Sequence, residues 1–259
     1  MERMRVAAIQ HDIVWNDRSA NFARLAPMVA AAAAGGARLV LLSETFSTGF
    51  AVNDPHLGEP QGGPSSQFLV QQAAQHGVWV CGSCPEVPAD SDPADTRPAN
   101  SFVLAGPDGT VHRYLKIHPF TFGGEDRHFR AGTELVQVVI EGVRVSPLVC
   151  YDLRFADEFW GLAATTDLYL VPANWPDARR LHWMALLQAR AIENQAYVVG
   201  CNRVGEGGGL KYVGDSRIVD PLGELLATGS QGETILFADI EPATVAGVRD
   251  RFRFLPDRR

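Results

Sequence analysis

The sequence is poor in cysteine and has no long apolar run, and these two absences exclude whole classes of protein. Its 259 residues include four cysteines, too few for a disulfide scaffold of this length. No apolar run approaches the length of a membrane span, and the first ten residues favour a strand over a secretory leader. We therefore expect a cytoplasmic protein with reduced thiols and no membrane partner.

Positive charge is also scarce, since 23 Lys and Arg stand against 30 Asp and Glu, which gives a formal net charge of −7. This balance argues against a nucleic-acid partner, and it requires that any anionic ligand be held by local cations. The chain has no HExxH, no HxH, no second CxxC and no GxSxG elbow. Residues 205–209 are rich in glycine but lack the lysine of a phosphate loop, so we expect a flexible loop there. We therefore expect neither a metal nor an organic cofactor.

What the sequence does contain is an alternation of short apolar runs and helical stretches. The runs at residues 38–43 and 78–82 are continuously apolar, which is typical of strands buried on both faces. Helices are favoured at residues 21–35, 65–76, 155–163 and 181–194, and hairpins at 101–116, 136–149 and 216–227. The pattern predicts an α/β fold in which two mixed sheets pack face to face with helices outside. Since no linker divides the chain, we expect a single domain over residues 1–259.

Three chemically active side chains stand where apolar strands end: Glu44, Lys116 and Cys150. A nucleophile at an abrupt turn after a buried strand presents its side chain outward, and the next backbone N–H, here that of Tyr151, can face a developing oxyanion. Taken singly, Cys150 is more typical of a buried structural cysteine, and Glu44 and Lys116 are more typical of solvated strand ends. Together they form a self-sufficient set for acyl transfer. A thiol of pKa ~8.5 needs a base; Glu44 would supply it, and Lys116 would stabilise the oxyanion.

The segments that carry these residues resemble a known family. Residues 41–46 (LLSETF), 114–120 (YLKIHPF) and 148–155 (LVCYDLRF) are similar to the three signature segments of nitrilase-superfamily amidases, in the right order. The resemblance extends over nearly the whole chain. It implies an α-β-β-α four-layer sandwich, a homodimer, no cofactor, and hydrolysis of small amides through a cysteine thioester. It also implies that Glu125 positions the lysine or the substrate amide. Ser43 stands where the family usually has proline.

Other segments are similar to one branch of that family, the ω-amidases, which hydrolyse the side-chain amide of 2-oxo acids such as 2-oxoglutaramate and 2-oxosuccinamate. The segments with this likeness are 171–176, 181–183, 189–197, 200–205 and 214–217. Such a substrate carries a carboxylate that a cation or a group of N–H donors should hold. Arg154 is the candidate nearest to Cys150 in sequence, and a structural ion pair is an equal alternative for it. Asn174, Trp175 and Phe120 are expected to line the same pocket.

Two alternatives stay open. The chain could be another amidase of the superfamily, acting on deaminated glutathione or on an N-carbamoyl compound. The CxxC motif formed by Cys81 and Cys84 offers a different class, a redox or metal-binding protein. A proline-rich loop follows this motif instead of the helix that a redox CxxC requires, which argues against the second alternative.

Overall fold

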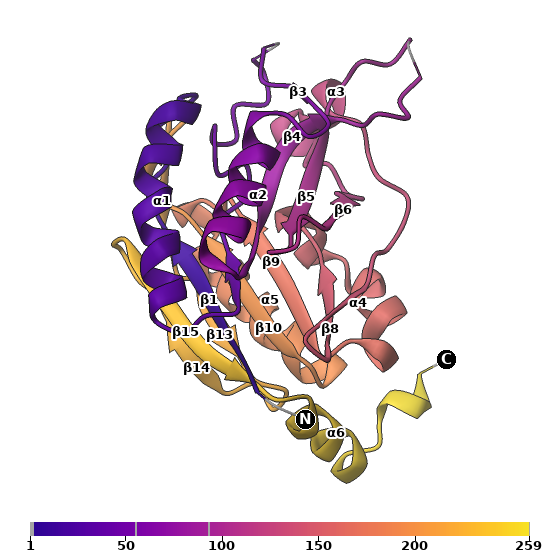
Figure 1. Ribbon diagram of the computed structural model, residues 1–259. Helices are drawn as coiled ribbons and strands as arrows, with labels where there is room; N and C mark the ends of the chain where they lie inside the picture. The colour runs from indigo at the N-terminus through magenta and orange to yellow at the C-terminus, as the bar shows by residue number, and fades with distance from the viewer. Residues whose placement is uncertain (1–2, 55, 93, 259) are drawn as a thin grey trace.

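Two large sheets, stacked face to face with helices outside them, organise the computed structural model, which describes residues 3–54, 56–92 and 94–258 (Figure 1). The first sheet has the order β15 (Thr234–Ile240), β1 (Met4–Gln10), β2 (Leu39–Leu41), β4 (Trp79–Val87), β5 (Ala99–Ala105) and β6 (Val111–Leu115), with β3 (Glu59–Pro60) beside β4. The second has the order β14 (Leu225–Thr228), β13 (Arg217–Val219), β10 (Tyr197–Asn202), β9 (Leu168–Ala173), β8 (Val143–Pro147) and β7 (Val138–Ile140). A separate hairpin joins β11 (Val204–Gly207) and β12 (Leu210–Val213).

Helices cover both outer faces of the stack. The α-helices of the described residues are α1 (Arg18–Ala34), α2 (Pro64–His76), α3 (Glu125–His128), α4 (Ala156–Leu162), α5 (Arg180–Asn194) and α6 (Pro242–Arg251). Side chains of α1 and α2, such as Leu25 and Leu69, pack with Val40 and Val80 of the first sheet. On the opposite side α5 packs closely on β10, because a Cβ at Gly200 would meet the side chain of Leu187 at 2.4 Å. The predicted four-layer α-β-β-α sandwich is confirmed.

The main core lies between the two sheets and explains the unbroken apolar runs of the sequence. It joins side chains of the first sheet, such as Leu41 and Phe102, to side chains of the second, such as Val145 and Leu170. Every residue of β5 is buried, as expected for a strand covered on both faces. The strand directions also position the functional end of the molecule. β2 and β6 run the same way in the first sheet, and β8 and β9 do so in the second.

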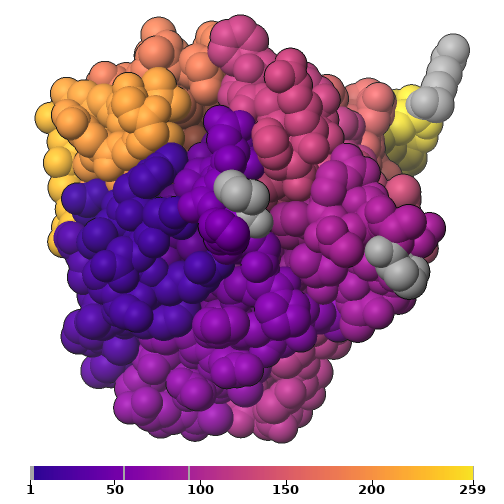
Figure 2. Space-filling view, turned by 90° about the horizontal axis from the view of Figure 1, so that it is seen from above, coloured from indigo at the N-terminus to yellow at the C-terminus, as the bar shows by residue number. Residues whose placement is uncertain are grey.

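The segments that follow these strands converge on one face of the molecule. Figure 2 looks down on this face, where the violet chain near residue 50, the magenta chain near residue 120 and the orange chain near residue 210 come together. Among the described residues, no helix combines the length and the apolar character that a membrane crossing requires.

Two local predictions were wrong. β4 continues to Val87 instead of ending at residue 82, so Cys81 and Cys84 both lie within a strand. Residues 205–209 are not a loop but belong to the β11–β12 hairpin, whose turn is made by Gly208 and Gly209. Both glycines have positive φ (56° and 76°), the backbone conformation that a tight hairpin turn requires.

Candidate active site

The turn that carries Cys150 has an unusual backbone. Cys150 itself has φ 45°, in the left-handed region that side chains other than glycine rarely adopt. The chain then enters a short 3₁₀ helix, Cys150–Arg154. The sequence predicted an abrupt bend at this strand end, and the structure has one. Strained conformations of this kind persist only where surrounding contacts hold them in place.

Asp152 holds the turn from within. Its buried carboxylate accepts hydrogen bonds from the backbone N–H of Val149 (2.9 Å), the backbone N–H of His118 (2.9 Å) and the hydroxyl of Tyr114 (2.8 Å). Desolvation of Tyr114, followed by the Asp152 charge, raises the pKa of this hydroxyl well above its usual range, so it remains a donor. The turn is therefore tied to β6, the strand that leads to Lys116.

Arg190 holds the same turn from outside. Its guanidinium donates two hydrogen bonds to the carbonyl of Leu153, at 2.9 and 3.1 Å, and pairs with Glu193 at 2.7 Å. These contacts give Arg190 and Glu193 a structural role. α5 thus supports the strained backbone of Cys150 without touching the thiol.

A buried ionic cluster lies beside the thiol. Glu44 follows β2, Lys116 follows β6, and Glu125 begins α3. The Lys116 ammonium donates to Glu44 Oε1 at 2.9 Å and to the two oxygens of Glu125 at 2.8 and 3.1 Å. All three side chains are at most 1% exposed. Glu44, Lys116 and Glu125 were all predicted to lie near Cys150. The structure brings their three side chains together in one ionic group.

Two asparagines complete the hydrogen bonding of this cluster. Asn100 was not predicted; its amide donates to Glu44 Oε1 at 2.8 Å and to Glu125 Oε1 at 3.0 Å. Asn174 donates its backbone N–H to Glu44 Oε2 at 2.8 Å and its side-chain amide to the Glu44 carbonyl at 2.5 Å. The orientation of the Glu44 carboxylate is therefore set by Lys116, Asn100 and Asn174 together.

Burial and charge shift the protonation of the site. Burial opposes a charge on Lys116, but the carboxylates of Glu125 and Glu44 outweigh it and raise the pKa of this ammonium. Burial raises the pKa of Glu125, and the Glu44 charge adds to this effect while Lys116 opposes it. Burial also raises the pKa of Cys150, again reinforced by Glu44 and opposed by Lys116. The resting site therefore holds a charged lysine and a protonated thiol at neutral pH.

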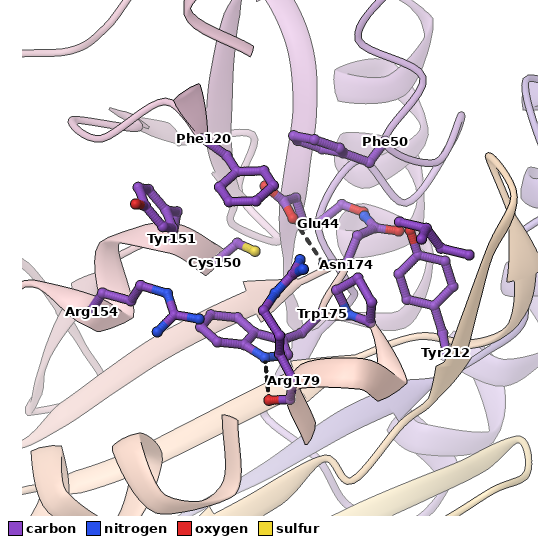
Figure 3. Close-up of a pocket in the computed structure, with 12 residues that line it drawn as sticks. Glu44, Phe50, Phe120, Cys150, Tyr151, Arg154, Asn174, Trp175, Arg179 and Tyr212 are labelled. Carbon is purple, nitrogen blue, oxygen red and sulfur yellow. Dashed lines mark hydrogen bonds between the residues drawn. The ribbon is translucent and has the colours of Figure 1, made fainter. Parts of the chain in front are cut away.

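Glu44 and Cys150 open onto a small pocket of about 420 Å³, part of it open to solvent (Figure 3). The predicted residues Phe120, Tyr151, Arg154, Asn174 and Trp175 all line it. The lining also includes Phe50, Pro176, Arg179, Leu210 and Tyr212. Lys116 and Glu125 lie behind Glu44 and are not part of the lining.

Five of the twelve residues that line the pocket are aromatic: Phe50, Phe120, Tyr151, Trp175 and Tyr212. The rings of Phe120 and Tyr151 meet edge to face at 5.0 Å, and the guanidinium of Arg154 lies 4.7 Å from the ring of Trp175. Arg154 contacts His182 at 3.3 Å, and among the described residues it pairs with no carboxylate. Arg154 therefore makes no structural ion pair among the described residues, and its side chain lines the pocket.

Comparison with known protein families shows that residues 5–250 match the carbon–nitrogen hydrolase family. The chain belongs to the carbon–nitrogen hydrolase family. It is 38% identical to omega-amidase YafV of Escherichia coli strain K12, over 97% of this chain and 95% of the relative. It is 32% identical to the 2-oxoglutaramate amidase of Bacillus subtilis strain 168, over 98% of this chain and 97% of the relative.

Solved structures of the same family have the same fold. A CN-hydrolase superfamily protein of Xanthomonas campestris aligns with a TM-score of 0.92 and 34% identity, covering 100% of this chain and 98% of that one. The amidase of Nesterenkonia sp. AN1, solved with acrylamide, aligns with a TM-score of 0.84 and 26% identity, covering 99% and 94%. The enzyme class that the family resemblance implied, a hydrolase of carbon–nitrogen bonds, is thereby confirmed.

The CxxC motif of this hydrolase cannot act as a pair. Three positions along a strand place two side chains on opposite faces. Cys81 accordingly packs in the core between the sheets, whereas Cys84 packs under α1 and α2. Both are buried free thiols whose pKa is raised by burial, the opposite of a reactive redox pair. This geometry argues against the redox or metal-binding alternative.

Proposed function

We propose that the chain is an ω-amidase, which releases ammonia from the side-chain amide of a short 2-oxo acid such as 2-oxoglutaramate or 2-oxosuccinamate. The observation that carries this proposal is the pocket itself, where Glu44 and Cys150 share one wall, backed by the buried Lys116. The relatives named as an omega-amidase and a 2-oxoglutaramate amidase, matched over nearly their full length, support the substrate class.

In the proposed mechanism the Cys150 sulfur attacks the amide carbon while Glu44 accepts the thiol proton. The Lys116 ammonium and the backbone N–H of Tyr151 stabilise the oxyanion. Glu44 then gives the proton to the nitrogen, the carbon–nitrogen bond breaks, and ammonia leaves a thioester on Cys150. A water molecule that loses its proton to Glu44 attacks the thioester and releases the acid, and the sulfur recovers its proton.

The raised pKa of Cys150 supports the role given to Glu44. A thiol that stays protonated at rest needs a base at the moment of attack, and the Glu44 carboxylate shares its pocket wall. Glu125 is proposed as a positioning residue. Its carboxylate holds the Lys116 ammonium and also accepts the backbone N–H of Phe120 at 2.5 Å, which links the lysine to the pocket wall.

The substrate contacts are proposals as well. Arg154 is assigned to the substrate carboxylate, and Asn174, Trp175 and Phe120 to the pocket walls. We further propose that residues 1–259 act as one domain in a homodimer in the cytoplasm. Four free cysteines support a reducing compartment, and the exposed apolar side chains of Trp160, Leu181 and Ile192 on α4 and α5 support a second copy on that face.

The test is an assay of ammonia release from a panel of amides. The panel contains 2-oxoglutaramate, 2-oxosuccinamate, deaminated glutathione and an N-carbamoyl amino acid. We expect the two 2-oxo acid amides to give the highest kcat/KM, and a slow substrate to add its acyl mass to Cys150. Cys150→Ala should abolish turnover, whereas Cys84→Ala, the matched control at another buried thiol, should retain it. Absence of turnover of either 2-oxo acid amide would contradict the ω-amidase assignment.

A further inference from the structure

Arg179 lines the pocket and was not predicted as part of it. It ends the short helix Asp177–Arg179, which follows Trp175 at the end of β9. Its guanidinium lies 5.3 Å from the centre of the Phe120 ring, and in Figure 3 its side chain extends into the pocket, beside Asn174. The half-buried cation therefore faces the space that the substrate would fill.

The neighbouring residue Arg180, by contrast, has a carboxylate partner. Arg180 makes two hydrogen bonds to the carboxylate of Asp215, at 2.8 and 3.0 Å, and so completes an ion pair of its own. Among the residues that the structure describes, Arg179 has no such carboxylate partner. An arginine with five donors and no anion, half-buried against an aromatic ring, is suited to receive one from a ligand.

Two hydrogen bonds fix the backbone of Arg179 at the edge of the pocket. The indole N–H of Trp175 donates to the Arg179 carbonyl at 2.8 Å, and the Arg179 N–H donates to the carbonyl of Pro176 at 3.0 Å. The Trp175 ring is itself a wall of the pocket and stacks under Arg154. A cation attached to the pocket wall in this way is preorganised, which lowers the entropy cost of binding an anion.

The rest of the pocket favours a ligand with one negative end. Apart from Glu44 beside the thiol, its charged lining residues are the two arginines, and most of the remaining wall is aromatic. Because the whole chain has a net charge of −7, its overall field repels an anion and the local cations must bind it. Arg154 is partly engaged, since it stacks on Trp175 and contacts His182.

We propose that Arg179 is a specificity-determining residue that binds the carboxylate of the substrate, with Arg154 beside it. This proposal rests on the proposed function, since it assumes a substrate whose amide and carboxylate lie at opposite ends. Arg179 thereby selects amides of short carboxylic acids over neutral amides of the same length. Its guanidinium can form two parallel hydrogen bonds to one carboxylate, a geometry that lysine cannot reproduce.

The test compares a charged with an uncharged substrate in the variant Arg179→Gln. For 2-oxoglutaramate we expect kcat/KM to fall about 100-fold, mainly through KM, because a charge-assisted bidentate contact is lost. For the neutral amide pentanamide we expect a change of at most about twofold, since this substrate has no carboxylate to lose. Arg179→Lys should recover about tenfold of the loss, since it restores the charge without the bidentate geometry.

Controls separate this role from a general effect on the protein. Arg24→Gln, which removes the same charge from an exposed ion pair with Glu233, should leave kcat/KM unchanged for both substrates. Inhibition by glutarate, which carries the carboxylate without the amide, should weaken in Arg179→Gln in parallel with the rise in KM. Thermal unfolding of each variant checks that the fold is intact.

Two kinds of result would overturn the proposal, and they are distinguishable. If Arg179→Gln lowers the turnover of both substrates equally, or of neither, the carboxylate is bound elsewhere while the ω-amidase assignment stands. If the wild-type protein hydrolyses pentanamide but no amide that carries a carboxylate, the proposed function itself fails. A selective loss with 2-oxoglutaramate, with partial recovery by lysine, supports Arg179.

Discussion

Buried carboxylates occur in two regions of this protein, and their partners differ. Under α2, Glu59 pairs with Arg18 at 2.7 Å and Glu86 pairs with Arg113 at 2.8 Å, and the arginine side chains are 26% and 23% exposed. Beside the thiol, Glu44 and Glu125 share Lys116, which is only 1% exposed. In the first region each carboxylate has its own arginine, which is partly exposed to water. In the second region two carboxylates share the buried ammonium of Lys116.

The difference separates a structural ion pair from a reactive one. A buried carboxylate is tolerated when a cation and hydrogen-bond donors satisfy it, as the backbone N–H groups of Gly62 and Ser65 do for Glu86 and Glu59. Burial raises the pKa of Glu125, and the Glu44 charge, which shares the same ammonium, adds to this effect. In the proposed mechanism, this imbalance of charge lies where a carboxylate exchanges a proton with the substrate.

The largest effect should come from removing Glu44, the proposed base of the region beside the thiol. Glu44→Gln keeps the shape of the side chain but cannot accept the thiol proton, so we expect kcat to fall by about 10⁴-fold. The matched change Glu59→Gln in the structural region should leave kcat within about twofold, because Glu59 is remote from the thiol. Steady-state ammonia release by the two variants makes the comparison, and equal losses of activity would refute the division into two kinds of site.

The next effect is on stability and belongs to the structural region. Arg113→Met leaves Glu86 buried without its cation, which we expect to lower the free energy of unfolding by about 2 kcal/mol. This loss of stability is smaller than for a fully buried ion pair, because the side chain of Arg113 is partly exposed. Urea unfolding measures it, and the specific activity of the folded protein should not change. A loss of activity without a loss of stability would reverse the assignment.

A smaller effect is expected where the hydrogen bonds of the reactive cluster are trimmed. Asn100→Ala removes donors from both Glu44 and Glu125. Hydrogen bonds to a carboxylate stabilise its charged form, so their loss makes protonation of Glu125, whose pKa burial already raises, more favourable. The acidic limb of the pH profile of kcat/KM should therefore move to higher pH, with a loss of about 30-fold in kcat at neutral pH. A loss of activity without movement of that limb would mean that Asn100 supports the fold alone.

The smallest effect sharpens the assignment of the thiol. Burial raises the pKa of Cys150 and the Glu44 charge adds to this effect, so Glu44→Gln should lower it even though the variant is nearly inactive. The pH dependence of alkylation by iodoacetamide, followed by mass spectrometry at Cys150, measures this shift. The alkylation midpoint should lie at lower pH in the variant than in the wild type. A midpoint that moves upward would show that Glu44 promotes the thiolate at rest.

Some of these features could be predicted from the sequence because they are local. Glu44, Lys116 and Cys150 each interrupt an apolar run at a strand end, so their positions follow from the pattern along the chain. Asn100 gave no such signal. It donates to a carboxylate 56 residues away, and only the folding of β5 between β4 and β6 brings the two together.

The errors in the predicted fold also have physical causes. β4 was predicted too short because Pro85, which pairs with Asn100 inside the sheet, is a residue that normally ends a strand. The β11–β12 hairpin was missed because its glycines obscure the alternation of a strand. Because the hairpin was missed, Tyr212 was not predicted to line the pocket. The hairpin places the ring of Tyr212 on the pocket wall.

The origin of the site residues has a consequence for how the protein folds. Glu44 and Lys116 follow strands of the first sheet, whereas Cys150 and Asn174 follow strands of the second. An intermediate with either sheet formed alone carries only half of the chemistry. During refolding from denaturant, the return of activity therefore reports the docking of the two sheets.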